Sequence, residues 1–347
     1  MAIGEHYAYT AEQANVNIGL MSGLGVNAVR LILKWNDTGT LDPLQAASIC
    51  NTARAMIAHH MAILTANLMP AAGDWPKDGD ALGAYRAAES AIFDLLLGQP
   101  GCALGSSKDG SPVPMLDLHF IGPNEINLTT FCDAATDDGD VRQQKCAEWY
   151  VPFEHTIYDT AQQAETKYGV PITVVGLVLG SHHNPLNEIA DVCRVWKASG
   201  YGVDMDQVGF HPYPLPQTYA PDGQIDPYSG VRMTPLVQSA ISNCFGRPIS
   251  VVYTEMGYET AVPTDKGYTG VAQNGVLYVD PATRVALTEH VAMLATSYGV
   301  VGIYNFLLFD EQSLASGWQS GLYYWNGDPK PFLSNYRFLM ARLADPD

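Results

Sequence analysis

The stretch ITVVGLVLG, residues 172–180, decides the fold class of this chain. Val, Leu and Ile fill most of it, and the glycines and the threonine interrupt the run without adding a charge. A near-continuous apolar run of this length is typical of a parallel β-strand that is buried on both faces. Helices must cover a sheet of such strands, so the stretch predicts an α/β protein.

Seven other runs share this pattern, and helical stretches separate them along the chain. The apolar runs predict strands at residues 2–8, 26–35, 61–68, 115–120, 172–180, 207–213, 249–255 and 301–309. The stretches between them predict helices at residues 12–24, 43–60, 81–97, 143–168, 186–199, 234–245, 281–298 and 330–343. Eight strand–helix pairs without a linker predict an α/β fold, a single (β/α)8 TIM barrel spanning residues 1–347 as one domain.

The lengths of the links indicate which end of this barrel carries the chemistry. Most helix-to-strand links are short and contain glycine, whereas several strand-to-helix links are much longer. Long loops at the carboxyl ends of the strands are where barrels of this kind hold their active sites. The link at residues 98–114 is an exception, because it places a long insertion on the opposite face, and the sequence assigns it no function.

The composition restricts the classes of partner. The chain has 347 residues, 47% of them hydrophobic, and its 18 basic and 36 acidic residues give a net charge of −18. This charge disfavours nucleic acids and anionic membranes and suits a neutral substrate. No apolar run approaches the roughly 18 residues of a membrane span, so we expect no membrane partner. We expect a monomer.

Six cysteines form no CxxC pair and no zinc-type spacing with histidine, which leaves disulfides or buried thiols. We predict a disulfide between Cys132 and Cys146, since closing a loop of about 15 residues contributes roughly 3 kcal/mol in the chain-entropy model. Cys193 and Cys244 lie on consecutive predicted helices and form a second candidate pair. The even cysteine count, the acidic balance and the few lysines favour a secreted protein, although residues 1–10 lack the features of a secretory signal.

Two glutamates follow predicted strands on the face with the long loops. The turn FIGPNEINL, residues 120–128, places Asn124 and Glu125 directly after one strand, and Glu255 ends the strand at 249–255. Two carboxylates across one pocket are what retaining hydrolysis of a glycosidic bond requires. One of them acts as acid and then as base, while the other forms a glycosyl ester. Either glutamate alone would be an ordinary loop residue, but the pair at two strand ends predicts catalysis.

These residues give the chain a resemblance to the large superfamily of retaining (β/α)8 glycoside hydrolases, which includes cellulases, β-mannanases, β-xylosidases and β-galactosidases. The resemblance implies that Glu125 is the acid/base, that Asn124 binds the sugar 2-hydroxyl and that Glu255 is the nucleophile. It also implies a carbohydrate substrate with β-linked sugars, cleavage by double displacement, and no cofactor or metal. The match covers nearly the whole chain, but the motifs are short and identify no single family.

The superfamily also implies supporting residues. Arg30 matches the arginine that supports the nucleophile, and His211 and Tyr213 match the positions beside it. Independently of the resemblance, an arginine on an otherwise apolar strand needs a buried partner, and an ionised carboxylate is the natural one. A tyrosine hydroxyl next to the nucleophile would keep that carboxylate charged.

Aromatic side chains on the same face are candidate platforms for the apolar faces of sugars. The superfamily usually has a tryptophan at the end of the eighth strand, where this chain has Phe306 or Tyr304. Trp318 and Trp325 in the following loop are alternatives, and Trp35 ends the second predicted strand. Asn67 ends the third strand and is a further candidate for contact with a substrate hydroxyl.

Two other classes of function stay open at this point. A metal-dependent barrel hydrolase would use histidines such as His182, His183 and His211, but the first strand offers only His6 where such enzymes need more ligands. A non-catalytic carbohydrate-binding barrel would keep the aromatic residues, but it has no need of both glutamates. The glutamate pair therefore favours the glycosidase.

Overall fold

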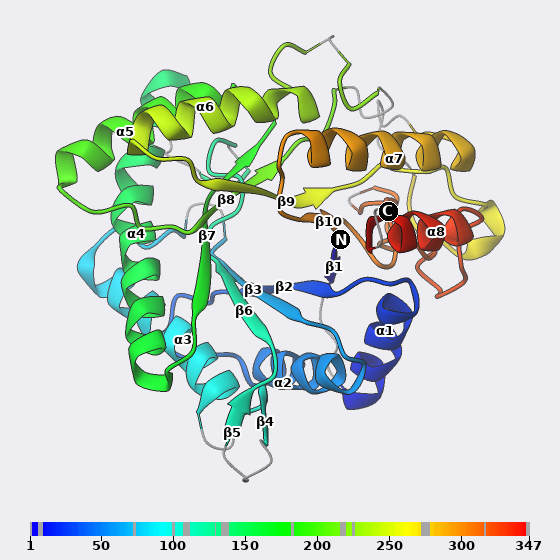
Figure 1. The fold of residues 1–347 in the computed structure, drawn as a ribbon, viewed down its shortest axis with the longest axis horizontal. Coiled ribbons are helices and arrows are strands. Elements are labelled where there is room, and N and C mark those ends of the chain that lie inside the picture. Colours follow the sequence, from blue (N-terminus) through cyan, green and yellow to red (C-terminus); the bar gives the residue numbers. More distant parts are fainter. Residues whose placement is uncertain are drawn as a thin grey trace.

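The computed structural model of the chain describes residues 2–5, 10–71, 74–98, 101–106, 112–128, 130–132, 139–181, 184–215, 220–223, 226–271, 278–315 and 317–344. Within them, eight parallel strands close into a barrel in the order β1-β2-β3-β6-β7-β8-β9-β10, and β10 pairs back onto β1 (Figure 1). The predicted (β/α)8 barrel is therefore confirmed. The barrel strands are Ala2–Glu5, Ala28–Lys34, Ile63–Met69, Asp117–Ile121, Ile172–Gly180, Gln207–His211, Ser250–Met256 and Ile303–Asn305.

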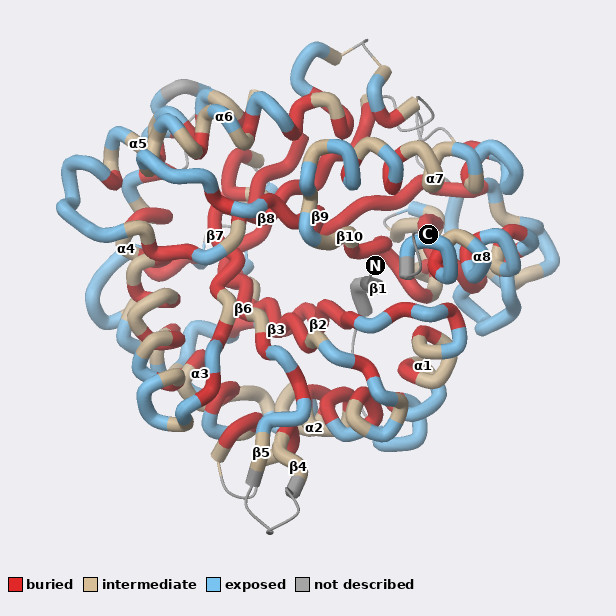
Figure 2. The backbone as a smooth tube through the Cα atoms, in the orientation of Figure 1, coloured by how far each residue is buried: buried red, intermediate tan, exposed pale blue. Residues whose placement is uncertain are grey.

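The helices surround the barrel, and each turns one face towards the strands. Figure 2 shows β2, β3, β7, β8 and β9 buried along most of their length, while the helices alternate between buried and exposed residues. The helices α1 to α8 are Ala11–Gly23, Pro43–Ala58, Gly79–Leu97, Gly139–Tyr168, Pro185–Ser199, Thr234–Phe245, Pro281–Ser297 and Leu333–Ala344. Short 3-10 turns at Val231–Met233 and Thr264–Lys266 lie within the loops after β8 and β9.

Helix starts follow the capping rules that the sequence indicates. The side chain of Asp42 accepts hydrogen bonds from the backbone N–H groups of Leu44 and Gln45 at the start of α2. Asp280 caps α7 in the same way. A proline at the first helical position follows each of these caps, where its missing N–H costs no hydrogen bond.

The strand β10 is much shorter than predicted. The sequence predicts a strand at 301–309, but the ladder ends at Asn305, and the apolar side chains of Leu307 and Leu308 are buried beyond it. Leu307 packs with Ile32 and Phe306 in one buried cluster, and Leu308 belongs to the main core, so both are buried without continuing the sheet. Apolar content alone does not distinguish these two situations.

The insertion at 98–114 contains a small antiparallel pair, β4 (Leu104–Ser106) and β5 (Pro112–Pro114), which projects from the barrel below α2 in Figure 1. A disulfide between Cys50 and Cys102 ties this segment to α2, and the sequence analysis did not predict it. The predicted disulfides Cys132–Cys146 and Cys193–Cys244 are both present.

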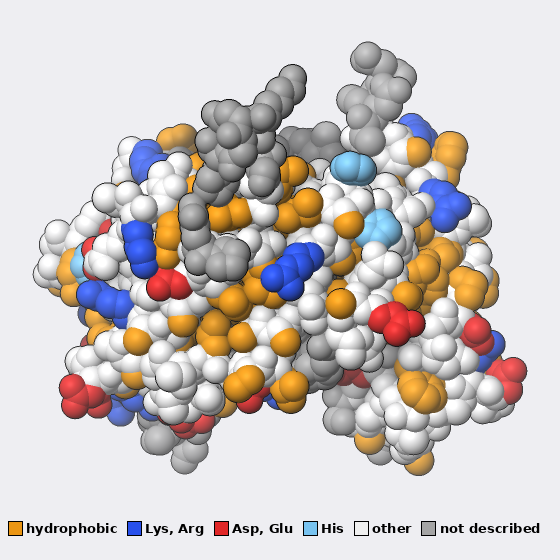
Figure 3. Space-filling model, turned by 90° about the horizontal axis from the view of Figure 1, so that it is seen from below, with side chains coloured by type: hydrophobic (Ala, Val, Ile, Leu, Met, Phe, Trp, Pro, Cys, Tyr) orange, Lys and Arg blue, Asp and Glu red, His pale blue; other side chains and the backbone are white. Residues whose placement is uncertain are grey.

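Neither a membrane span nor a basic patch stands out on the described surface. No helix in the described ranges is long and apolar enough to cross a membrane. On the face drawn in Figure 3, lysine and arginine side chains are scattered among acidic and hydrophobic ones and do not form a continuous basic surface.

A buried carboxyl group lies between α4 and the barrel. Glu154 is 1% exposed, and its carboxyl group contacts Gly176 of β7, where a Cβ atom would collide with it. Burial raises the pKa of Glu154 to about 8, and the negative charges of Asp204 and Asp206 act in the same direction. The folded protein therefore holds a proton on this side chain at pH values where the unfolded chain has lost it.

We predict that the free energy of unfolding falls as the pH rises from about 4.5 to about 8, by up to about 1.4 kcal/mol per pH unit for this group. Below this window both states bind the proton, and above it neither does. Glu154→Gln removes this group and should make the slope shallower in urea denaturation, while Glu89 and Glu188, whose pKa burial also raises, keep contributing to it. Glu148→Gln, an exposed change on the same helix, should leave the slope as in the wild type. Identical slopes for the wild type and Glu154→Gln would contradict the assignment.

Candidate active site

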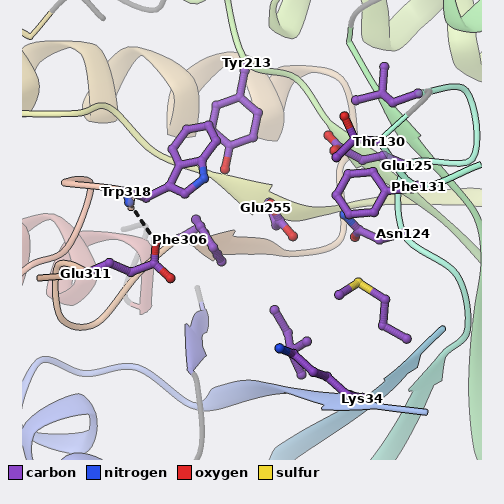
Figure 4. A pocket seen from close by; sticks show the side chains of 13 residues that line it. Lys34, Asn124, Glu125, Thr130, Phe131, Tyr213, Glu255, Phe306, Glu311 and Trp318 are labelled. Carbon is purple, nitrogen blue, oxygen red and sulfur yellow. Dashed lines mark hydrogen bonds between the residues drawn. The ribbon is translucent and has the colours of Figure 1, made fainter. Parts of the chain in front are cut away.

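A cavity of about 440 Å³ opens at the carboxyl ends of the strands (Figure 4). Within the described residues, both predicted catalytic glutamates line it, together with Asn124, Tyr213 and the aromatic residues Phe306 and Trp318. Its remaining described lining consists of Ile32, Lys34, Met69, Leu128, Thr130, Phe131 and Glu311. The barrel thus brings residues from β2, β3 and β9 together with the loops after β6, β8 and β10.

Glu255, near the end of β9, forms an ion pair with Arg30 of β2. The guanidinium Nη1 donates to the Glu255 Oε1 atom at 2.6 Å and to the backbone carbonyl of Thr254 at 3.0 Å. Arg30 is fully buried, while 12% of the Glu255 side chain is exposed towards the cavity. The arginine lies behind the carboxylate, so it stabilises the ionised form without blocking access to it.

The same guanidinium also positions two amides. Its Nη2 donates to the Asn67 Oδ1 atom at 2.6 Å and to the Asn124 Oδ1 atom at 2.9 Å. Because the oxygen of Asn124 accepts from the arginine, its Nδ2 group is the end left to face the cavity. Asn67 instead donates its own Nδ2 to the carbonyls of Ile121 and Gly122. It therefore ties β3 to the end of β6 and does not line the cavity.

Glu125 follows β6 in a strained turn. Its φ of 38° lies in the left-handed region, which residues other than glycine adopt infrequently and which recurs at functional sites. The turn is held because Asn127 exchanges two hydrogen bonds with the backbone of Gly180, at 2.8 and 2.9 Å. A Cβ atom at Gly180 would lie 2.8 Å from the Glu125 Oε1 atom, so the glycine leaves room for this carboxylate.

A buried histidine joins the two glutamates. The Nδ1 atom of His211 lies 3.0 Å from the Glu125 Oε1 atom and 3.7 Å from the Glu255 Oε2 atom. These two carboxylate oxygens therefore lie at most 6.7 Å apart, the sum of 3.0 and 3.7 Å. The Nε2 atom of His211 contacts the Thr254 hydroxyl at 2.9 Å, which fixes the ring between the two carboxylates.

Tyr213 and two aromatic residues form the wall opposite Asn124 (Figure 4). The hydroxyl of Tyr213 is buried and has no hydrogen-bond partner among the described residues. Burial raises the pKa of Tyr213 well above its usual value, and the negative charges of Glu255 and Glu125 add to this effect. The hydroxyl therefore keeps its proton as a donor. Trp318 packs on Tyr213 at a centroid distance of 5.7 Å and on Phe306 at 6.0 Å.

Trp318 is held in place through its backbone. Its N–H donates to the Glu311 Oε2 atom at 2.9 Å, and the N–H of Glu311 donates back to its carbonyl at 3.0 Å (Figure 4). The next residue, Gln319, accepts at its carbonyl from the ammonium of Lys330 at 2.9 Å. Lys330 is buried and pairs with Asp310 at 2.7 Å. The loop that carries the tryptophan thus rests on a buried ion pair.

Several predicted site residues lie away from the cavity. Trp35 is buried and packs edge-on against Tyr85, and Trp325 is a partly exposed loop residue whose indole N–H donates to the carbonyl of Lys266. His211 and Arg30 do not line the cavity, but they contact the two glutamates that do. His6, His182 and His183 fall outside the described residues. Within the described ranges, no group of three His, Cys, Asp or Glu residues could hold a metal ion.

The sequence analysis missed part of the lining. Ile32 and Lys34 follow Arg30 at intervals of two along β2, so strand alternation alone could have placed them on the inward face. Met69 stands in the same relation to Asn67 on β3. The remaining missed residues lie on loops, where no periodicity indicates which side chains turn inward.

Comparison with known proteins finds solved structures of the same fold. No protein-family model matches the chain, and no curated protein matches it. Solved structures do match. A family 39 glycoside hydrolase from Bacteroides cellulosilyticus is 14% identical with a TM-score of 0.63, over 99% of this chain and 64% of that one. The chain thus spans less than two thirds of that enzyme.

Two further structures match over nearly their whole lengths. A broad-specificity GH5-4 endoglucanase from Ruminococcus champanellensis with bound cellotriose is 15% identical with a TM-score of 0.58, over 97% of this chain and 95% of that one. An active-site mutant of a Rhizomucor miehei β-1,3-glucanosyltransferase in complex with laminaritriose is 13% identical, with a TM-score of 0.52 and 95% coverage of each chain. At these identities the likeness confirms the resemblance at the level of the barrel fold.

The buried guanidinium yields a test of the site. Arg30→Met leaves the charge of Glu255 without its guanidinium partner, and breaking a buried ion pair in this way typically costs about 3–5 kcal/mol in the free energy of unfolding. The double variant Arg30→Met/Glu255→Gln should recover part of that loss in urea denaturation, because no carboxylate charge remains. Arg54→Met on the exposed side of α2 is the control and should change stability little. Equal losses for the single and the double variant would refute the coupling.

Proposed function

We propose that this protein is a retaining glycoside hydrolase that cleaves β-linked glycosides or polysaccharides by double displacement with two glutamates. The observation that carries the proposal is the placement of Glu125 and Glu255 on either side of His211, with carboxylate oxygens at most 6.7 Å apart. Retaining enzymes hold their carboxyl groups roughly 5–5.5 Å apart, whereas inverting enzymes need roughly 6.5–9.5 Å to admit a water molecule. The upper bound includes the whole retaining range and overlaps only the lower edge of the inverting range, so it favours retention.

Glu255 is the proposed nucleophile. In the first step its carboxylate attacks the anomeric carbon, a glycosyl–enzyme ester forms, and the bond to the leaving-group oxygen breaks. Arg30 keeps the carboxylate ionised, and the free hydroxyl of Tyr213 is a donor available to the carboxylate or to the sugar. Arg30 approaches from behind the lining, and 12% of the Glu255 side chain stays exposed towards the cavity, where the substrate would bind.

Glu125 is the proposed acid/base. It gives its proton to the departing oxygen in the first step, and in the second step it takes a proton from the water that hydrolyses the ester. The Nδ2 group of the adjacent Asn124 faces the cavity and is the proposed donor to the sugar 2-hydroxyl, a contact that strengthens as positive charge develops on the ring. Trp318 and Phe306 form the proposed apolar platform under the sugar.

The proposed setting is extracytoplasmic. Three disulfides, Cys50–Cys102, Cys132–Cys146 and Cys193–Cys244, join segments on the outside of the barrel. Disulfides persist in oxidising compartments and are rare in the reducing cytosol. A secreted enzyme acting on extracellular carbohydrate fits this pattern.

Glu255→Gln should abolish hydrolysis of aryl β-glycosides almost completely, because an amide cannot attack the anomeric carbon. A 2-deoxy-2-fluoro β-glycoside slows the second step and should leave a glycosyl ester on Glu255 that peptide mass spectrometry detects. Glu311, a third carboxylate in the lining, is the internal comparison and should carry no label. A label on Glu311, or an active Glu255→Gln enzyme, would refute the assignment.

Glu125→Ala should reduce activity far more on substrates with poor leaving groups than on activated aryl glycosides, which need little protonation. Added azide should restore the second step and yield a β-glycosyl azide, because it replaces the water that Glu125 no longer activates. The measurement is kcat/KM across aryl leaving groups, with product analysis by NMR. Losses that are equal for all leaving groups, without azide product, would show that Glu125 is not the acid/base.

A further inference from the structure

Lys34 is the last residue of β2, and it lines the cavity while remaining exposed to solvent. It follows Arg30 and Ile32 on the inward-facing side of the strand. Figure 4 shows its amino group turned into the cavity, on the side away from Tyr213. Four residues of strand span about 13 Å, which is the separation along β2 between Lys34 and the arginine behind Glu255.

No carboxylate neutralises Lys34. Among the described residues it forms no ion pair, whereas Lys167, Lys266 and Lys330 each pair with an aspartate. The other charged residues of the described lining have partners of their own. Glu255 pairs with Arg30, Glu125 contacts His211, and Glu311 accepts from the N–H of Trp318.

The cavity wall near Lys34 is apolar. Ile32 and Phe306 belong to one buried hydrophobic cluster, against which Met69 and Trp318 pack. A substrate that fills the cavity displaces the water that solvates the ammonium group. Removing water from an ammonium group without supplying a counter-charge costs free energy. Lys34 is exposed, so a bound substrate removes only part of its water, and an anionic substituent on the substrate is the group that would supply the counter-charge.

We propose that the substrate is an acidic glycoside and that Lys34 binds its anionic substituent. The chemistry is that of a carboxylate or sulfate oxygen, so a uronic acid and a sulfated sugar both satisfy it. This inference rests on the proposed function, and it makes Lys34 a residue that determines specificity. The negative charge of the whole protein does not oppose it strongly, because salt screens exposed charges beyond about 8–10 Å, whereas the ion pair forms in direct contact.

The experiment compares three aryl glycosides that share a leaving group and differ only at C6: the β-glucoside, the β-glucuronide and the β-glucoside 6-sulfate. The readout is the ratio of kcat/KM for each acidic substrate to that for the neutral one. We expect this ratio to exceed one in the wild type for at least one acidic substrate. Lys34→Met should lower it by about threefold or more, the effect of losing an ion pair that stays partly exposed to solvent.

Two control variants sharpen the result. Lys34→Arg keeps the charge and should retain most of the preference, and Lys197→Met removes an unpaired exposed lysine on α5 and should leave the ratio unchanged. A higher ratio for the glucuronide identifies a carboxylate as the preferred substituent, and a higher ratio for the 6-sulfate identifies a sulfate. A wild-type ratio below one for both arms, or equal losses on all substrates in Lys34→Met, would overturn the inference while leaving the proposed hydrolase intact. Hydrolysis of none of the three would also overturn the inference, and the labelling of Glu255 tests the proposed hydrolase separately.

Discussion

The ion pair between Arg30 and Glu255 is the constraint around which the candidate site is built. A guanidinium with no exposure to solvent must find acceptors inside the barrel, and it finds a carboxylate, a backbone carbonyl and two amides. These acceptors come from β9, from β3 and from the turn after β6. One buried cation therefore sets the relative positions of three parts of the barrel that lie far apart in the sequence. The proposed nucleophile, Glu255, lies on one of these parts, β9.

Different interactions hold the residues on the two sides of the cavity. On the strand side, the ladder and the buried arginine hold the residues, and the turn with Glu125 is fixed to β7 through Asn127. On the loop side, Trp318 owes its place to backbone hydrogen bonds and to the buried pair of Lys330 and Asp310. Electrostatic interactions between buried polar groups are stronger than those in water. A buried ion pair can therefore fix the conformation of a long loop.

The sequence predicted the parts that depend on periodicity. The eight strands, the helices and the two glutamates follow from apolar runs and the places where they end, and the structure confirms the barrel. It did not predict the disulfide from Cys50 to Cys102, because that pairing depends on how an irregular insertion folds back on α2. It could not choose between Trp318 and Trp325, since loop side chains have no repeat. The position of Lys34 in the cavity was predictable, because residues 30, 32 and 34 of a strand point to the same face.

The alternation along β2 has a consequence for how the chain can vary in length. Arg30, Ile32 and Lys34 face the barrel interior only because the strand starts in one particular register against β1 and β3. One residue gained or lost in the turn at 24–27 would turn these three side chains outward and bring their neighbours in. The same change in the loop after β9 would move no strand. Natural insertions and deletions should therefore accumulate in the loops around the cavity and in the 98–114 segment, while the other turns beneath the barrel, which are short, keep a fixed length.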